Sequence, residues 1–218
     1  MSAVASRRSY STSDLDLIEM QLQAQARRSL WAYRQYMHPH LIFGWWQRDV
    51  AAQLSRFYDD LISGRRPILL IQAPPQHGKS VQVVDFISWL SGRHPEIRTI
   101  YASFSERLGI RANLSLQRIY DSRKYQAVFN TRISTRNAIA ISSQTQRNRE
   151  LLEYVGADGY LRNTTVRGPV TGEGLDLGIL DDPVKGREEA NSAAIRDKTW
   201  DWLTDDFMSR MSDKAGLL

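Results

Sequence analysis

Residues 67–80 read PILLIQAPPQHGKS, and this stretch decides the fold. The four consecutive apolar residues Ile68–Ile71 do not alternate with polar ones, which predicts a strand buried on both faces, as in a parallel sheet. A helical pattern begins at Lys79 and ends at Ser91-Gly92, and its apolar residues are Val84, Ile87 and Leu90. We therefore expect a buried strand, a short loop and a helix.

The loop between these two elements has the pattern of a phosphate-binding loop. Residues 73–80 match G-x-x-x-x-G-K-[ST], except that Ala73 replaces the first glycine. We expect the phosphates to lie against the loop residues Pro75, Gln76, His77 and Gly78, where the glycine allows close approach. Lys79 would contact the β- and γ-phosphates of ATP and Ser80 would bind Mg²⁺, beside the positive end of the helix dipole. The alternative, a chance turn with a surface lysine, is disfavoured by the strand and helix around it.

The segments on either side extend this α/β pattern. RTIYASF at 98–104 predicts a second strand, and Ser105 is expected to cap a helix with Leu108, Ala112, Leu116 and Ile119 on one face. This order predicts a mostly parallel sheet with helices on both faces. Before the loop we expect a helix over 14–37, capped by Ser13, and another over 46–62. Their apolar positions are Leu15, Ile18, Leu22 and Ala26 in the first, and Val50, Leu54, Phe57 and Leu61 in the second.

The segments after residue 137 are less regular. Shorter β elements are expected over 138–166, with a hairpin turn at Asp158-Gly159, followed by a glycine-rich loop over 167–174. LDLGILDD at 175–182 predicts an apolar strand that ends in two carboxylates. From Arg187 a helix is expected, and its buried positions are Trp200, Leu203, Phe207 and Met211.

Composition narrows the class of protein. A chain of 218 residues with 42% hydrophobic and 24% charged residues is typical of one globular domain with short additions. The net charge of +5 is compatible with a polyanionic partner and equally with a solvated surface. With no cysteine, a disulfide, a thiolate metal site and a cysteine nucleophile are excluded. No apolar run approaches the roughly 18 residues of a membrane helix. We expect a disordered tail at 1–13, a helical segment at 14–40 and the main domain at 41–218.

The two carboxylates after the apolar run complete a predicted site. Asp181 ends the strand and is expected to bind Mg²⁺ through water, and Asp182 to act as the general base for the attacking water. Gln47 in GWWQRDV could hold adenine through its amide, and a polar residue at a helix start is an equal alternative. Arg162 and Arg167 are candidates for an added positive charge at a neighbouring subunit's nucleotide, although a solvated or DNA-facing arginine is favoured for each.

Three motifs in this order resemble the ATPase domain of the large terminase subunit of tailed bacteriophages. They are APPQHGKS, YASFSERL at 101–108 and TGEGLDLGILDDPVKGREEA at 171–190, and the similarity covers roughly 40–215, including NSAAIRDKTWDWLTDDFMSRM. The strand expected at 98–104, between the loop motif and the acidic motif, indicates the ASCE type of P-loop fold, which uses an added carboxylate. The resemblance implies a magnesium-dependent ATPase that drives double-stranded DNA into a procapsid. It also implies a portal protein, a small terminase subunit, a homo-oligomeric ring and the cytoplasm of an infected bacterial host. DNA contacts are expected through backbone phosphates, and no membrane is expected.

Two departures from the family pattern matter. The family often has an arginine where this chain has Gln76, which gives more weight to an arginine from a neighbouring subunit. The sequence stops at Leu218, before the expected coupling strand and nuclease domain, so we expect no DNA cleavage by this chain. The alternatives are a helicase-like translocase and a nucleotide-binding but inactive prophage remnant or docking fragment.

Overall fold

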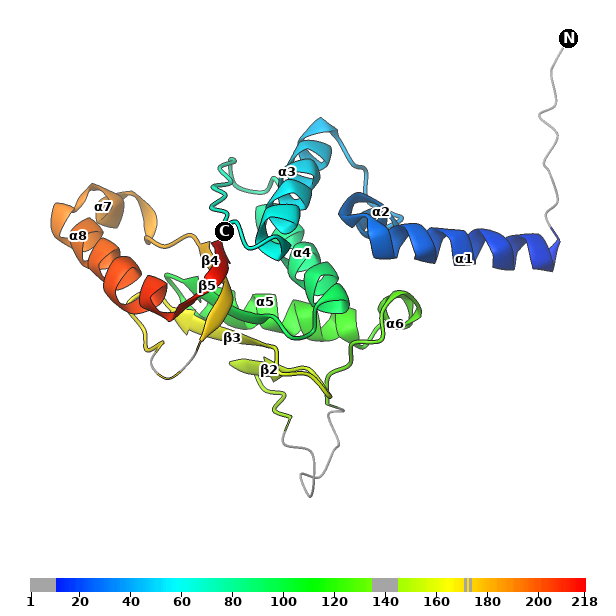
Figure 1. The fold of residues 1–218 in the computed structure, drawn as a ribbon. Helices are drawn as coiled ribbons and strands as arrows, with labels where there is room; N and C mark the ends of the chain where they lie inside the picture. Colours follow the sequence, from blue (N-terminus) through cyan, green and yellow to red (C-terminus); the bar gives the residue numbers. More distant parts are fainter. Residues whose placement is uncertain (1–10, 135–144, 171, 173) are drawn as a thin grey trace, which may run out of the picture.

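The computed structural model describes residues 11–134, 145–170, 172 and 174–218 (Figure 1). The helices are α1 (Thr12–Arg28), α2 (Leu30–Met37), α3 (Trp45–Ile62), α4 (Lys79–Arg93), α5 (Glu106–Tyr120), α6 (Arg123–Val128), α7 (Gly186–Asn191) and α8 (Ala193–Asp201). The strands are β1 (Arg98–Ser103), β2 (Leu151–Glu153), β3 (Tyr160–Thr165), β4 (Leu175–Asp181) and β5 (Met211–Leu217). A π-helical turn, η1 (Trp202–Phe207), and a 3-10 turn, η2 (Met208–Arg210), connect α8 to β5.

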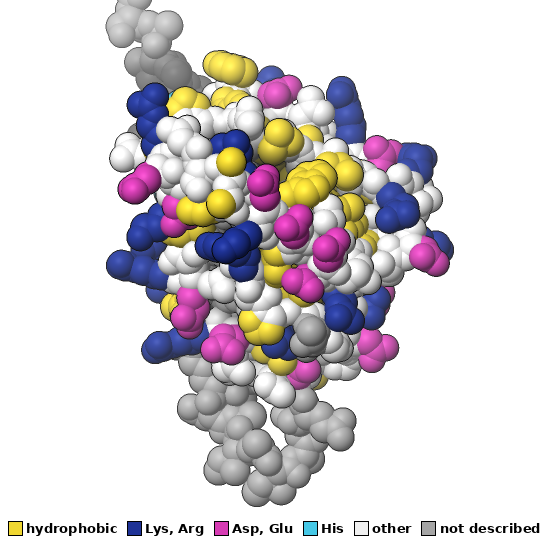
Figure 2. All heavy atoms as spheres, turned by 90° about the vertical axis from the view of Figure 1, so that its left-hand side faces the viewer, with side chains coloured by type: hydrophobic (Ala, Val, Ile, Leu, Met, Phe, Trp, Pro, Cys, Tyr) yellow, Lys and Arg dark blue, Asp and Glu magenta, His cyan; other side chains and the backbone are white. Residues whose placement is uncertain are grey.

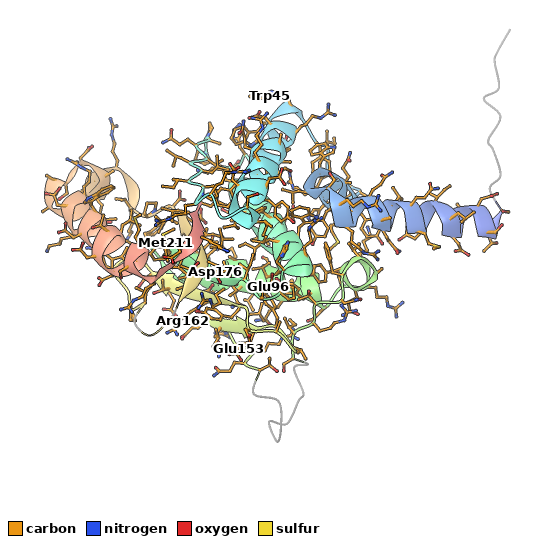
Figure 3. All side chains as sticks on the ribbon, in the orientation of Figure 1. Trp45, Glu96, Glu153, Arg162, Asp176 and Met211 are labelled. Carbon is orange, nitrogen blue, oxygen red and sulfur yellow. The ribbon has the colours of Figure 1, made fainter. Side chains whose placement is uncertain are left out.

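The strands of the described residues form one mostly parallel sheet, which confirms the predicted α/β class. The strand order is β2-β3-β1-β4-β5. β1 runs parallel to both β3 and β4, β4 runs parallel to β5, and only β2 is antiparallel to its neighbour. Five of the six residues of β1 are buried, as a central parallel strand requires. Arg98 at the start of β1 forms an ion pair of 2.9 Å with Asp176 of β4. Asp176 is labelled in Figure 3, near Met211.

Helical elements cover both faces of this sheet. One hydrophobic cluster contains Tyr101 of β1 and Ile179 of β4, together with residues of α3, α4 and α5. The other contains Ile100 and Ala102 of β1, together with Trp202 and Phe207. Since successive side chains of a strand point to opposite faces, the alternation along β1 divides the core into these two layers.

The N-terminal helical region differs from its prediction. The helix begins at Thr12 and is capped by Ser11, whose side chain accepts from the Asp14 N–H, so Ser13 is not the cap. A break at Ser29 separates α1 from α2. In the predicted apolar stripe only Ala26 is buried, because α1 extends away from the sheet (Figure 1) and little of the chain covers its first turns. Residues 1–10 of the predicted tail lie outside the described residues.

The helices on either side of the loop agree better with the sequence. The four predicted apolar residues of α3 are buried, and the helix ends at Ser63-Gly64, where Gly64 has φ +70°. Helix α4 continues through Ser91-Gly92 to Arg93, so the predicted stop is wrong. A Cβ on Gly92 would lie 2.5 Å from the Phe129 ring. The glycine therefore makes room for a core aromatic ring instead of ending the helix.

The segment before the loop is not the doubly buried strand that its composition predicts. Only Ile68 forms a bridge, to Leu217 of β5. Ile68 and Leu70 are 71% and 77% exposed, while Leu69 and Ile71 pack against the core. The segment lies at the edge of the described sheet, so only one of its faces is covered. Its unbroken apolar run is typical of an inner strand, which is why the sequence predicts burial on both faces.

The C-terminal part contains the largest difference from the prediction. Trp200, expected in the buried stripe, is 63% exposed, and Trp202 is buried instead. The π-helical turn makes residues five apart neighbours, and the rings of Trp202 and Phe207 lie 5.2 Å apart. Met211, predicted to be helical, begins strand β5. An uninterrupted helical period cannot anticipate this change of register.

The predicted β elements of 145–166 are present as β2 and β3, while 138–144 lie outside the described residues, as do 171 and 173 of the glycine-rich loop. The turn between β2 and β3 is formed at Val155-Gly156, with Gly156 at φ +74°, and Asp158-Gly159 follow it in the same connection. Ser105 is the N-cap residue of α5, but its side chain makes no capping hydrogen bond. Within the described part of the chain, no helix is both long and apolar enough to cross a membrane.

Candidate functional site

The loop over 73–78 leads from the edge of the sheet into the first turn of α4. Gly78, the N-cap residue of α4, has φ +76°, and Gln76 has φ +66°. A side chain is rarely stable in this left-handed region, so glycine is the residue that fits at position 78. A Cβ at Gly78 would have no atom within 4 Å, so the space above the loop is open. Pro75, Gln76, His77 and Gly78 are all exposed, as a ligand-binding loop requires.

Four predicted residues meet at the carboxyl end of β4. The Ser80 hydroxyl donates a hydrogen bond of 3.3 Å to an Asp181 carboxylate oxygen, across 101 residues of sequence. Lys79 Nζ lies 4.0 Å from an Asp182 carboxylate oxygen. Asp181 is the last residue of β4, and Asp182 follows at φ +46° with its side chain exposed. The structure therefore brings Lys79, Ser80, Asp181 and Asp182 together.

A residue that the sequence did not single out completes this group. The hydroxyl of Tyr101, from β1, donates a hydrogen bond to the same Asp181 oxygen that Ser80 contacts. Burial raises the pKa of the Tyr101 phenol far above its ordinary value, and the Asp181 carboxylate raises it further. Tyr101 therefore remains a protonated donor at neutral pH. The pairing of Tyr101 in β1 with Ile179 in β4 places the Tyr101 hydroxyl beside Asp181. The sequence of either strand alone does not predict this pairing.

Helix α3 supports the loop from the other side. The Trp46 indole N–H donates a hydrogen bond of 3.1 Å to the His77 carbonyl, and the His77 ring contacts the Pro75 carbonyl at 3.0 Å. Trp45 is exposed at the upper end of α3 in Figure 3. The Gln47 side-chain oxygen accepts from the Gly44 N–H at 2.9 Å, in a capping box. This contact is the helix-start role that the sequence offered as the alternative to adenine binding.

The two candidate arginines come from β3 and from the turn after it. Arg162 lies within β3, and Arg167 lies in the exposed turn that follows it, with φ +67°. Within the described part of the chain, no ion pair or hydrogen bond joins Arg167 to Lys79, Asp181 or Asp182. A role for Arg167 at its own chain's site therefore has no support in these contacts.

A buried ionic cluster holds α4, and with it the loop, against α2. Arg34 Nε lies 2.9 Å from one carboxylate oxygen of Asp85, and His38 Nε2 lies 2.8 Å from the other. Arg34 also donates to the Gln82 side chain at 2.8 Å. Arg34 and Asp85 are only 2% and 1% exposed. Buried charges are stable only when paired, so this cluster fixes the position of the helix that begins with Lys79.

Two cavities adjoin the group. One, of about 400 Å³, is lined by Ala73, Lys79 and Asp182. The other, of about 380 Å³, lies between α4 and α5 and opens onto Ser80 and Asp181. Among the described residues no set of three or more histidine and acidic side chains is arranged to hold a metal ion by itself.

The chemistry of the group suits a polyphosphate with a divalent cation. Backbone N–H groups at the start of a helix and a lysine attract phosphate. A hydroxyl and a carboxylate are the oxygen ligands that Mg²⁺ takes from protein when phosphate and water supply the rest. The shared contact between Ser80 and Asp181 places both oxygens where one ion could bind them. The donor set therefore fits a magnesium–nucleotide complex.

No protein-family model matches this chain, and no curated protein matches its sequence.

Proposed function

We propose that this chain is a magnesium-dependent ATPase of the P-loop, ASCE type, and that it is the motor domain of a phage terminase large subunit that moves double-stranded DNA into a procapsid. One observation gives the main support for the proposed ATPase activity. Ser80, at the start of the helix after the loop, contacts Asp181, at the end of a strand 101 residues away. A turn with an unrelated surface lysine would not require this meeting.

The roles of the residues follow from their positions. Lys79 would contact the β- and γ-phosphates, which also lie against the backbone of Pro75, Gln76, His77 and Gly78. Ser80 and Asp181 would hold Mg²⁺, which neutralises phosphate charge when bound. Asp182 is exposed and would accept a proton from the attacking water.

The order of the sheet supports the ASCE type. The segment at Ile68 bridges β5, β5 pairs with β4, and β4 pairs with β1. A strand therefore lies between the segment before the loop and the strand that carries Asp181. This inserted strand is typical of P-loop ATPases that use an added carboxylate. Gln76 leaves the loop without an arginine, so we propose Arg167 as a cation for the nucleotide of a neighbouring subunit. Adenine binding by Gln47 would require its oxygen to leave the Gly44 N–H.

The proposed function is tested by phosphate release. The native chain is incubated with saturating ATP, with magnesium and with a chelator in its place. We expect steady release in magnesium and none with the chelator. No release in magnesium, with nucleotide still bound, would favour the inactive docking fragment over the motor ATPase.

Tyr101→Phe is expected to weaken magnesium binding. The substitution keeps the ring in the core but removes the hydrogen bond to Asp181 that orients its carboxylate. Loss of such a supporting contact costs about 10-fold or more in metal affinity or activity. We expect the magnesium concentration at half-maximal rate to rise about 10-fold, with a smaller effect at saturating magnesium. Tyr125→Phe is the control, because Tyr125 is also buried and its hydroxyl donates to the Ser88 carbonyl of α4 and not to Asp181. Equal magnesium dependence in the two variants would contradict a positioning role for Tyr101.

Binding to double-stranded DNA is expected to fall steeply with salt. Contacts with backbone phosphates release condensed cations, so the logarithm of the association constant should fall linearly with the logarithm of the salt concentration. We expect no preference between duplexes of different sequence, since backbone contacts carry no sequence information. The measurement is fluorescence anisotropy of two labelled duplexes over a salt series. Affinity that does not change with salt would argue against the proposed partner.

A further inference from the structure

The groove between α4 and α5 has mostly apolar walls and two exposed arginines, and Asp85 and Asp181 also line it. Its volume of about 380 Å³ is large enough for an indole ring. Val81 and Val84 of α4 form one wall, and Leu108 and Ile119 of α5 form part of the other. Arg111 and Arg118 of α5 also line the groove. Within the described part of the chain, no ion pair or hydrogen bond engages the guanidinium group of either arginine.

An exposed tryptophan with two carboxylates beside it lies on α8. Trp200 is 63% exposed, an unusual position for so large an apolar side chain. Asp197 lies three residues before it and Asp201 follows it, so all three share one side of the helix. Neither aspartate forms an ion pair with a described residue. Figure 2 shows this end of the molecule, where exposed hydrophobic side chains lie among both acidic and basic ones.

The two surfaces lie on opposite faces of the sheet. α5 packs in the cluster that contains Tyr101, through Ala112 and Leu116. Trp202, which directly continues α8, packs in the other cluster, against Ile100 and Ala102. One copy therefore cannot place its own Trp200 in its own groove. Two complementary surfaces at different places on a chain form a head-to-tail contact that repeats into a ring or a filament.

We propose that Trp200 of one copy, flanked by Asp197 and Asp201, docks into the α4–α5 groove of a second copy. The indole would lie between the apolar walls, and the carboxylates would meet Arg111 and Arg118. The apolar walls favour this occupant over a polyanion, which gains nothing from valine, leucine and isoleucine. The expectation that this contact closes a ring rests on the proposed function. The contact would also cover the opening of the groove beside Ser80 and Asp181.

Sedimentation velocity of the full chain without nucleotide tests the contact. We expect concentration-dependent association that Arg111→Glu/Arg118→Glu and Asp197→Lys/Asp201→Lys each weaken at least about 10-fold, because each pair of changes places like charges opposite one another. A chain with all four changes should regain association, since the charges are complementary again. In a mixture of the two double variants, the acidic tryptophan surface of one meets the basic groove of the other, and the reversed surface and groove are complementary as well. The mixture should therefore associate beyond a dimer although neither variant does so alone, whereas a symmetric contact would stop at a dimer.

Two further variants test the tryptophan itself. Trp200→Ala should weaken association, and Trp45→Ala, which removes another exposed tryptophan, should not. A native chain that stays monomeric, association that survives both charge reversals, or equal loss in the two tryptophan variants would overturn the proposal. So would an Arg111→Glu/Arg118→Glu variant that loses duplex DNA binding while still associating. Since no arm of the association experiment requires ATP hydrolysis, failure of the proposed ATPase leaves this result interpretable.

Discussion

Replacing Lys79 with alanine is expected to reduce phosphate release from magnesium-ATP by about 100-fold or more. Lys79 is the first residue of α4, and its ammonium group lies beside Asp182, at the mouth of the open loop. A charge positioned against the transferred phosphoryl group contributes more in the transition state than in the ground state, so its removal lowers the rate strongly. The alanine shortens the side chain without changing a buried contact, and the fold should persist.

The measurement is the steady-state rate of phosphate release at saturating magnesium-ATP. Lys214→Ala removes an exposed lysine from β5 and serves as the matched control, with an expected rate close to that of the native chain. Circular dichroism of each variant checks that the fold is retained. A Lys79→Ala variant that hydrolyses ATP at the native rate would show that the activity does not arise at this loop.

Breaking the buried pair between Arg34 and Asp85 is expected to cost about 3–5 kcal/mol of unfolding free energy, a large part of the stability of a domain this size. Arg34→Ala leaves the Asp85 carboxylate with His38 alone, in a site that is almost free of solvent. An uncompensated buried charge is the physical reason for the loss. Since Asp85 is on α4, we also expect the loop to lose its fixed position before the whole domain unfolds.

Urea unfolding measures this prediction against an exposed pair. Arg65 lies 2.5 Å from Asp60, but the two side chains are 60% and 42% exposed. Arg65→Ala should therefore change the free energy of unfolding by only about 0.5 kcal/mol. A double variant, Arg34→Met/Asp85→Leu, removes both charges and should be more stable than Arg34→Ala. Equal effects of Arg34→Ala and Arg65→Ala would mean that the cluster does not hold α2 against α4.

The differences between sequence and structure share a cause. Ile68 and Leu70 were expected to be buried because apolar runs usually lie inside a sheet, but the segment lies at the edge of the described one. Trp200 was expected to be buried because it fits a helical period, but the π-helical turn after it brings Trp202 to the core instead. In each case the sequence pattern identified an apolar segment, and the packing of neighbouring elements decided which of its side chains are buried.

By itself the sequence determined the α/β class, the helix that starts at Lys79 and the identity of the residues around the loop. These features depend on local rules: the spacing of apolar residues, the glycine before Lys79 and the end of an apolar run at Asp181. Only the tertiary structure decided that Tyr101 and Ser80 share one Asp181 oxygen, and that Arg34 reaches Asp85. It also decided that Met211–Leu217 forms a strand. Such contacts depend on strand order, register and helix packing, which join residues far apart in the chain and are set by the burial of the whole core.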